Sequence, residues 1–307
     1  MELQFLGTGA GSPSISRNVS CTALKNVGKN GEVWLFDCGE ATQHQILRTN
    51  IKPGRIRRIF ITHLHGDHIF GLPGLLSSRS FLGGTDGALS IYAPQGIRGF
   101  VEAALGASQT RLSYPLEFFE FSEGGTILET PEFTVSAIGL AHRVPSFAYR
   151  IVERDRTGGL QVARLLELGI SPGPLFGRLK SGASVTLGDG RVIDGRDYLD
   201  EDIKGRIIAV FGDTKSCEAE LAAAADADII VHEATFADGE EEAAAKFMHA
   251  TVSDAAALAV RARAKKLYLT HISARYAGEE MRLMLEAQAQ AVFPAARVVK
   301  DFDTFPV

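Results

Sequence analysis

The sequence predicts a layered α/β domain built from two similar halves. In the first half, short apolar runs of strand-like composition alternate with turns. In the second half, which begins near residue 205, strand-like runs alternate with helical patterns. A third observation is that side chains able to bind metals follow directly after several of these runs. We therefore expect one α/β domain over residues 1–307, with a functional site at its strand ends.

The individual elements follow from apolar periodicity and from turn residues. The first half is predicted to contain strands at Leu3–Leu6, Val33–Phe36, Arg58–Thr62 and Leu89–Tyr92 and a helix at Ile97–Leu105. The second half is predicted to contain a strand that ends before Asp213, a helix at Glu218–Ala225, a strand at Ile229–His232, a helix at Ala255–Ala264, a strand at Lys266–His271 and a helix at Glu279–Gln290. Ser253 and Asp254 are predicted to cap the Ala255–Ala264 helix, because such side chains accept hydrogen bonds from free backbone N–H groups.

An insertion at about residues 153–202 separates the two halves. It contains an amphipathic segment, Leu160–Leu168, then a stretch rich in glycine and proline, then the basic residues Arg178 and Lys180. Composition alone indicates a solvent-facing hairpin or helical loop.

The run from Thr62 to His68 (THLHGDH) holds three imidazoles and a carboxylate within six residues. It follows the predicted strand, and Gly66 interrupts the strand pattern, so a loop is expected. Alternation along the strand places His63 and His65 on the same side. Neutral imidazole and carboxylate are ligands that zinc prefers. Histidines that are merely solvated on a loop are the alternative interpretation.

Other metal-binding side chains follow further strand-like runs, namely His142, Asp213 and His271. Together with the first cluster they give five histidines and two aspartates. This set is large enough for two metal ions with room left for water, although a single-metal site stays open.

Composition limits the class of protein. A chain of 307 residues with 45% hydrophobic residues supports a large core. We find no 20-residue apolar stretch and no signal peptide, so a soluble cytoplasmic protein without membrane contact is expected. The three cysteines are far apart and suggest neither a disulfide framework nor a CxxC metal site. The net charge of −5 counts weakly against RNA as a partner, although local basic patches matter more than the total.

The glycine-rich segment Gly7–Gly11 does not complete a dinucleotide-binding fingerprint, because Ser12 and Pro13 follow it. A glycine-rich turn near the active site is the better interpretation. Asp37 follows the strand Val33–Phe36. From the sequence alone it can be part of a simple turn at the end of that strand.

Motifs along nearly the whole chain resemble the metallo-β-lactamase superfamily and, within it, the ribonuclease Z family in its short form. The superfamily signature is the HxHxDH run. The more specific matches are Ser78-Arg79-Ser80, His232-Glu233-Ala234-Thr235, His249-Ala250-Thr251 and His271–Tyr276. Two positions depart from the family: Ala250 replaces a serine, and Ile15 stands where the Pro-x-Lys-x-Arg-Asn element has lysine. Because the second departure lies in an element that the family links to the tRNA 3′ end, it leaves open whether a CCA sequence at that end blocks cleavage.

The resemblance implies a four-layer αββα metallo-β-lactamase fold with a protruding arm insertion. It implies two zinc ions per chain, one held by His63, His65 and His142 and the other by Asp67, His68 and His271, with Asp213 bridging them. Asp37 would support the metal-binding loop from outside the ligand set.

The resemblance also implies a zinc-dependent endoribonuclease that removes the 3′ trailer of precursor tRNA and leaves a 3′-hydroxyl. A metal-bridging hydroxide would be the nucleophile, and Asp67, His249 and Glu233 would be catalytic, with His249 as general acid oriented by Glu233. Arg275 would hold the scissile phosphate. Gly173, Pro174, Arg178 and Lys180 of the arm would contact the tRNA elbow, and the family forms homodimers.

Three alternatives to this function stay open. A 3′ exonuclease activity would accompany endonuclease cleavage. Another hydrolase of the superfamily would act on a small ester, thioester or cyclic phosphodiester, but a small substrate gives no reason for an arm of this length. A metal-bearing RNA-binding protein without turnover would not need the complete ligand set.

Overall fold

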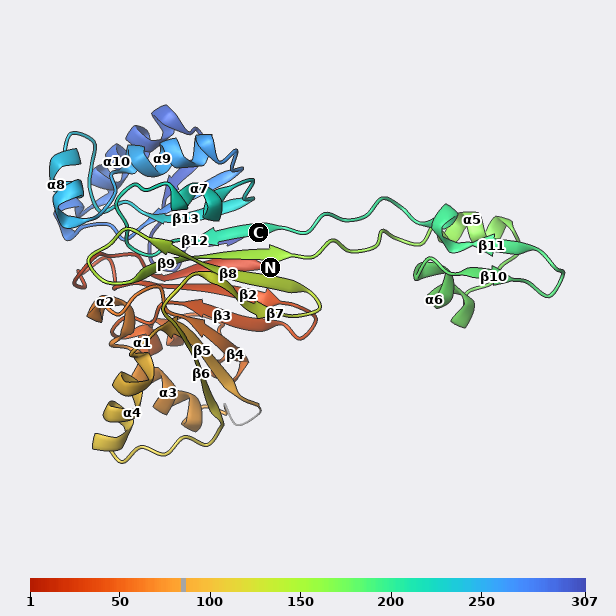
Figure 1. Cartoon of the computed structure of the whole chain (residues 1–307), viewed down its shortest axis with the longest axis horizontal. Helices are drawn as coiled ribbons and strands as arrows, with labels where there is room; N and C mark the ends of the chain where they lie inside the picture. The colour runs from red at the N-terminus through yellow and green to blue at the C-terminus, as the bar shows by residue number, and fades with distance from the viewer. Residues whose placement is uncertain (84–86) are drawn as a thin grey trace. The chain divides into compact units, whose positions relative to one another are not determined.

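The computed structural model describes residues 1–83 and 87–307 and divides into two compact units (Figure 1). One unit, here called the body, contains Met1–Val152 and Ile207–Val307. The other, here called the insert, contains Glu153–Arg206. Within the described ranges, no helix has both the length and the apolar character needed to cross a bilayer.

Two seven-stranded sheets form the centre of the body as far as it is described. In spatial order, the first sheet contains β16 (Thr304–Pro306), β1 (Glu2–Gly7), β2 (Cys21–Val27), β3 (Glu32–Phe36), β4 (Ile56–Phe60), β5 (Leu89–Pro94) and β6 (Leu116–Phe121). The second contains β15 (Ala296–Val298), β14 (Lys266–Thr270), β13 (Ile229–Glu233), β12 (Ile207–Val210), β9 (Ser146–Glu153), β8 (Phe133–Leu140) and β7 (Gly125–Glu129).

Each sheet contains a parallel portion, β3 to β6 in the first and β12 to β15 in the second. Parallel strands end at a common edge, and ligands bind outside the carboxyl ends of such strands. The candidate site residues after β3, β4, β12 and β14 lie at such edges.

An aromatic core lies between the two sheets. Phe36 and Phe60 of the first sheet stack with ring centroids 5.2 Å apart, and Phe60 also contacts Tyr149 of the second sheet at 5.3 Å. Because successive side chains of a strand point to opposite faces, Ile59 packs instead into the core on the outer side of its sheet. Strands buried on both faces explain the nearly continuous apolar runs in the sequence.

Helices cover the outer face of each sheet (Figure 1). Those of the first half are α1 (Thr42–Leu47), α2 (Gly66–Ile69), α3 (Leu72–Phe81) and α4 (Ile97–Ala107), and a short 3₁₀ turn spans Pro53–Arg55. Those of the second half are α7 (Ala219–Ala224), α8 (Glu241–Phe247), α9 (Val252–Arg261) and α10 (Glu279–Val292), with a 3₁₀ turn at Ala274–Tyr276. Helix, sheet, sheet, helix is the αββα order, so the expected fold is confirmed.

The insert has its own small core, made of Leu165, Ile170, Leu179, Val185 and Ile193. These residues come from two helices and a hairpin and from the turns between them. The elements of the insert are α5 (Val162–Glu167), α6 (Pro174–Lys180), β10 (Ser184–Thr186), β11 (Val192–Asp194) and a 3₁₀ turn at Gly195–Tyr198.

Two local predictions are wrong. The helix predicted at Ala255–Ala264 begins at Val252, and Thr251, not Ser253, is its N-cap. Thr251 accepts a hydrogen bond from the Asp254 N–H while the Asp254 carboxylate accepts from the Thr251 N–H, which is a capping box. Gly66 does not open a plain loop but begins α2, so Asp67 and His68 lie in a short helix.

Candidate metal centre and active site

Eight side chains gather at the carboxyl ends of the strands of the body. Three sets have ligand atoms within 4.8 Å of one another: His63, His65, His142 and Asp213; Asp67, His68 and His271; and Asp213, His249 and His271. His63 and His65 follow β4, Asp67 and His68 lie in α2, His142 follows β8, Asp213 follows β12, and His271 follows β14. The seven side chains expected to bind metal therefore lie together, and His249 lies beside them.

One ring nitrogen of several of these histidines is held from outside the cluster. His68 Nδ1–H donates to Asp37 at 2.7 Å, and His142 Nδ1–H donates to the Met248 carbonyl at 2.8 Å. Thr235 donates its hydroxyl to Glu233, so its oxygen accepts from His271 Nδ1–H at 2.8 Å. These bonds orient the rings and turn the Nε2 atom of each towards the cluster.

The inner ring nitrogens converge at short distances. His65 Nδ1 lies 3.1 Å from His63 Nε2 and 3.3 Å from His142 Nε2. On the other side, His68 Nε2 and His271 Nε2 are 3.4 Å apart. Where neither of two facing nitrogens carries a proton, their lone pairs repel unless a cation lies between them. The residues present therefore fit divalent metal ions.

Asp213 lies between the two histidine sets. Its Oδ2 atom is 3.6 Å from His63 Nε2 and 3.3 Å from His271 Nε2, while Oδ1 is 3.6 Å from His68 Nε2. A carboxylate in this position can share its two oxygens between two cations.

Burial sets the protonation of the histidine set nearest β4. It lowers the pKa of His63, His65 and His142, so these rings are neutral and keep lone pairs for a metal. Burial acts against ionisation of Asp67, but hydrogen bonds with His271 and His68 hold the pKa of its carboxyl well below the ordinary range. Asp67 also accepts the Gly11 N–H at 2.8 Å, which places the glycine-rich turn at the site.

The backbone around the cluster departs from ordinary geometry. Asp37 and His271 have φ angles of 61° and 55°, in the left-handed region that few side chains other than glycine adopt. Gly39 must be glycine, because a Cβ there would lie 2.3 Å from the carbonyl oxygen of Asp67. Such strained or close-packed backbone is common at functional sites, where the surrounding contacts stabilise it.

His249 and Glu233 form a pair at the edge of the cluster. His249 Nδ1–H donates to Glu233 Oε1 at 2.8 Å, and Glu233 is buried. Burial would lower the pKa of His249, but the Glu233 carboxylate raises it above its ordinary value. Burial would raise the pKa of Glu233, but the bond with His249 lowers it to about 2. The pair therefore holds a proton on His249.

A cavity of about 490 Å³ opens over the cluster. His65, Asp213, His249 and Arg275 are among the residues that line it. The Arg275 guanidinium lies 4.9 Å from the centre of the Phe236 ring and pairs with Glu240 at 3.1 Å. A phosphate bound at Arg275 would compete with Glu240.

Comparison with known proteins identifies the family. Ribonuclease Z of Bacillus cereus (strain AH187) is 52% identical over 307 residues, covering 100% of this chain and 99% of that protein. Ribonuclease Z of Bacillus thuringiensis (strain Al Hakam) has the same identity and coverage. This chain belongs to the ribonuclease Z family. A family model described as Anti-Pycsar protein Apyc1 matches residues 1–120 only.

Solved structures agree with membership of the ribonuclease Z family. Human tRNase Z, short form, superposes with a TM-score of 0.72 at 29% identity, covering 100% of this chain and 99% of that one. The metallo-beta-lactamase fold protein YhfI from Bacillus subtilis has a TM-score of 0.68 at 18% identity, covering 99% of this chain and 98% of that one, and this likeness concerns the fold alone.

The two departures from the ribonuclease Z motifs lie in different surroundings. Ile15 is fully exposed, whereas Ala250 is fully buried and its carbonyl accepts the Phe236 N–H at 3.2 Å. Arg17, in the same element as Ile15, is buried and donates to the Thr8 hydroxyl and to the Val299 carbonyl.

The expected arm residues lie in the insert. Gly173 precedes α6 and Pro174 begins it, while Arg178 and Lys180 are exposed on the same helix. Lys180 donates to the Gly158 carbonyl at 2.7 Å. Basic and acidic residues are equal in number in the insert, yet α6 carries only basic ones.

Sequence reasoning missed the groups that hold the histidines from outside. Thr62, whose hydroxyl oxygen lies 3.0 Å from His63 Nδ1, Thr235 and Met248 are ordinary residues in the sequence. Met248 is 106 positions from the histidine that its carbonyl binds. It also missed Phe247, which lines the cavity. Its position two residues before His249 is the only sequence signal.

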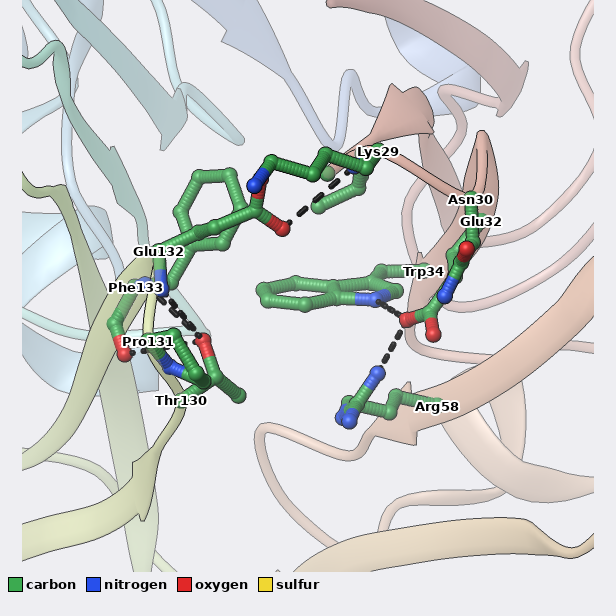
Figure 2. Close-up of a pocket in the computed structure, with 11 residues that line it drawn as sticks. Lys29, Asn30, Glu32, Trp34, Arg58, Thr130, Pro131, Glu132 and Phe133 are labelled. Atoms are coloured by element: carbon green, nitrogen blue, oxygen red, sulfur yellow. Dashed lines mark hydrogen bonds and ion pairs between the residues drawn. The ribbon is translucent and has the colours of Figure 1, made fainter. Parts of the chain in front are cut away.

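A second cavity, of about 390 Å³, is lined by residues of β3 and β4 and by Thr130–Phe133, and none of the cluster residues lines it (Figure 2). Glu32 accepts from the Trp34 indole N–H at 2.8 Å and pairs with Arg58, and Glu132 accepts the Lys29 backbone N–H at 3.3 Å. Glu32 and Arg58 thus pair with each other, although the buried Arg58 Nε has no hydrogen-bond partner among the described residues.

Proposed function

We propose that this chain is an endoribonuclease that removes the 3′ trailer from precursor tRNA and leaves a 3′-hydroxyl on the tRNA. The observation that carries the proposal is the cluster itself. Seven side chains suited to metal binding lie together, and four of them, with His249, border one cavity, in a chain 52% identical over its length to a curated ribonuclease Z.

Two zinc ions are the metals that this ligand set favours. His63, His65 and His142 would hold one ion, Asp67, His68 and His271 the other, and Asp213 both. Bound there, the ions would lower the pKa of water to about 7 and would offset negative charge on the scissile phosphate. Asp67 would contribute to catalysis by fixing the geometry of its ion, since the Gly11 N–H holds its carboxylate.

His249 supplies the proton that the leaving 3′-oxygen needs. Glu233 keeps that proton on the ring and fixes the ring's orientation. General acid catalysis of this kind contributes about 10²–10⁴-fold to the rate. Arg275 would hold a non-bridging oxygen of the phosphate after leaving Glu240.

The insert would bind the tRNA elbow far from the cut. Gly173 and Pro174 shape the start of α6, and Arg178 and Lys180 would neutralise phosphates there. No ion pair of Arg178 occurs among the residues that the structure describes. A local basic helix makes the overall charge of −5 compatible with an RNA substrate.

A homodimer would be the working form. Leu47 at the end of α1 is 70% exposed, and Phe81 and Leu82 at the end of α3 are 86% and 53% exposed. Exposed apolar groups of this size mark interfaces, and α1 contacts α3. A second copy of the chain is the partner that the family suggests for this surface.

The proposal is tested with precursor tRNA labelled at either end, with and without CCA before the trailer. One 3′-hydroxyl product at the trailer junction is expected, together with an intact released trailer. Stepwise shortening from the 3′ end would instead reveal exonuclease action. Absence of cleavage by metal-loaded protein would contradict the proposal, and Asp213→Ala protein is the control for a contaminating nuclease.

A further inference from the structure

An aromatic side chain stands exposed beside the cluster. Phe247 is the last residue of α8, is 48% exposed, and lines the same cavity as Asp213 and His249. Neither the metal-binding residues nor the His249–Glu233 pair uses it. The exposed ring therefore borders the space that a substrate would fill.

The position of Phe247 is fixed from both sides. The carbonyl of Lys246 accepts from the Arg143 guanidinium at 3.2 Å, and the carbonyl of Met248 accepts from the ring of His142 at 2.8 Å. The Phe236 ring lies nearly parallel to that of Phe247, at 12°, with centroids 6.2 Å apart. The exposed ring is therefore held in one place relative to the cluster, as a preorganised contact requires.

Cationic groups surround these two rings. The Arg143 guanidinium and the Lys246 ammonium each lie 5.8 Å from the centre of the Phe247 ring. The Arg275 guanidinium lies 4.9 Å from the centre of the Phe236 ring and also pairs with Glu240. An aromatic face next to cations matches an unpaired nucleotide, whose base stacks while its phosphates meet the positive charge.

We infer that Phe247 is the stacking platform for the base of the last nucleotide that the tRNA retains. The assignment of this nucleotide rests on the proposed function. His249 gives its proton to the leaving 3′-oxygen, which belongs to the retained nucleotide. Phe236 adjoins His249, with centroids 6.2 Å apart, so the two phenyl rings lie on that nucleotide's side of the cut.

The experiment compares two precursor tRNAs, one intact and one abasic at the last retained nucleotide. Phe247→Leu keeps apolar volume but removes the flat ring, and Phe247→Tyr keeps the ring. Phe247→Leu is expected to lower kcat/KM on the intact precursor by about 5- to 160-fold, the range that base-on-aromatic stacking gives. On the abasic precursor it is expected to change little, and Phe247→Tyr is expected to retain most of the activity on both.

Two controls separate stacking from support of the site. Phe119→Leu removes a phenyl ring of similar exposure, 45%, on β6 and should change neither substrate's rate. Zinc content and melting temperature of Phe247→Leu should match the wild type, because a structural role through His142 would alter them.

The outcomes are distinct. Equal proportional loss on both precursors, loss of zinc, or no loss on the intact precursor would overturn the stacking role. If the wild type itself leaves the intact precursor uncut, the proposed function fails, whatever Phe247 does.

Discussion

Two histidines on neighbouring segments show how contacts, not residue type, assign a role. His249 uses Nδ1 for Glu233, and within the described residues its Nε2 has no hydrogen-bond partner. His232 is fully buried, with Nε2 3.0 Å from the Glu220 carboxylate and Nδ1 2.7 Å from the Glu233 carbonyl. Both partners of His232 are acceptors, so both nitrogens must donate. His249 can give away a proton, whereas His232 holds its protons for structure.

His249→Ala is expected to lower the single-turnover cleavage rate by about 10²–10⁴-fold. Binding of precursor tRNA should stay nearly unchanged, because the lost interaction forms mainly in the transition state. Single-turnover kinetics at saturating enzyme and a filter-binding assay measure the two quantities. Weakened binding together with a normal single-turnover rate would remove His249 from the general-acid role.

His232 should make stability depend on pH. Burial alone would lower the pKa of His232. The hydrogen bond and charge of Glu220 outweigh burial, so the pKa of His232 lies above its ordinary value. A raised folded-state pKa contributes stability that is complete below the unfolded pKa of about 6.5 and is lost as pH rises through the folded value. The difference in free energy of unfolding between wild type and His232→Gln should therefore shrink from pH 6 to pH 9. Urea unfolding measures it, and a difference that grows with pH would show that His232 is neutral.

At the scale of elements, the Thr251–Asp254 capping box begins the helix that follows His249. Thr251→Ala should lower the free energy of unfolding by about 1 kcal/mol, the usual cost of an N-cap, and Thr251→Ser should restore most of it. Chemical denaturation checks this. An unchanged stability in Thr251→Ala would mean that the cap is dispensable here.

Some elements could be predicted from the sequence and others could not, for physical reasons. The strands at Leu3–Leu6 and Val33–Phe36 are confirmed to within a residue, because burial on both faces gives continuous apolar runs. Strand β6, Leu116–Phe121, was not predicted, and its side chains are mostly exposed or half-buried. The start of α9 was placed at Ala255 because Ser253 and Asp254 are also good caps, and only the fold decides among adjacent candidates.

The sequence predicted which residues form the candidate site, but it did not predict the hydrogen bonds that orient them. Imidazole and carboxylate after successive strands predict a cluster, since parallel strands end at one edge. The hydrogen bonds that orient the rings join distant residues, such as Thr235 with His271 and Met248 with His142. These pairs depend on how the sheets pack, which local patterns do not record.

At the scale of the whole molecule, the insert and the body each have a core of their own. The Glu153 N–H donates to the Arg206 carbonyl at 2.8 Å, so removal of residues 154–205 leaves two ends that a short glycine linker joins. The truncated protein should fold and should still hydrolyse bis(p-nitrophenyl) phosphate if the full chain does. Its kcat/KM for precursor tRNA should fall, because binding energy from the elbow is lost. Equal loss on both substrates would mean that the insert supports the active site.

Single substitutions refine that comparison. Arg178→Ala should reduce the slope of tRNA binding against salt by about one unit, as loss of one phosphate contact does. Arg191→Ala is the matched control, because Arg191 is paired with Asp189 at 2.7 Å in the same insert. Equal slopes for the two variants would remove Arg178 from the tRNA contact.

The central proposal is that seven side chains would hold two zinc ions, which would activate the water that cleaves the tRNA trailer. Metal-free protein titrated with zinc, with bound metal and precursor tRNA cleavage measured at each step, tests this most directly. Cleavage should be absent without metal and should reach its plateau at about two bound ions per chain, whereas Asp213→Ala should bind both ions weakly and stay inactive. Full cleavage by protein with no bound metal, or a plateau at one ion, would contradict the account.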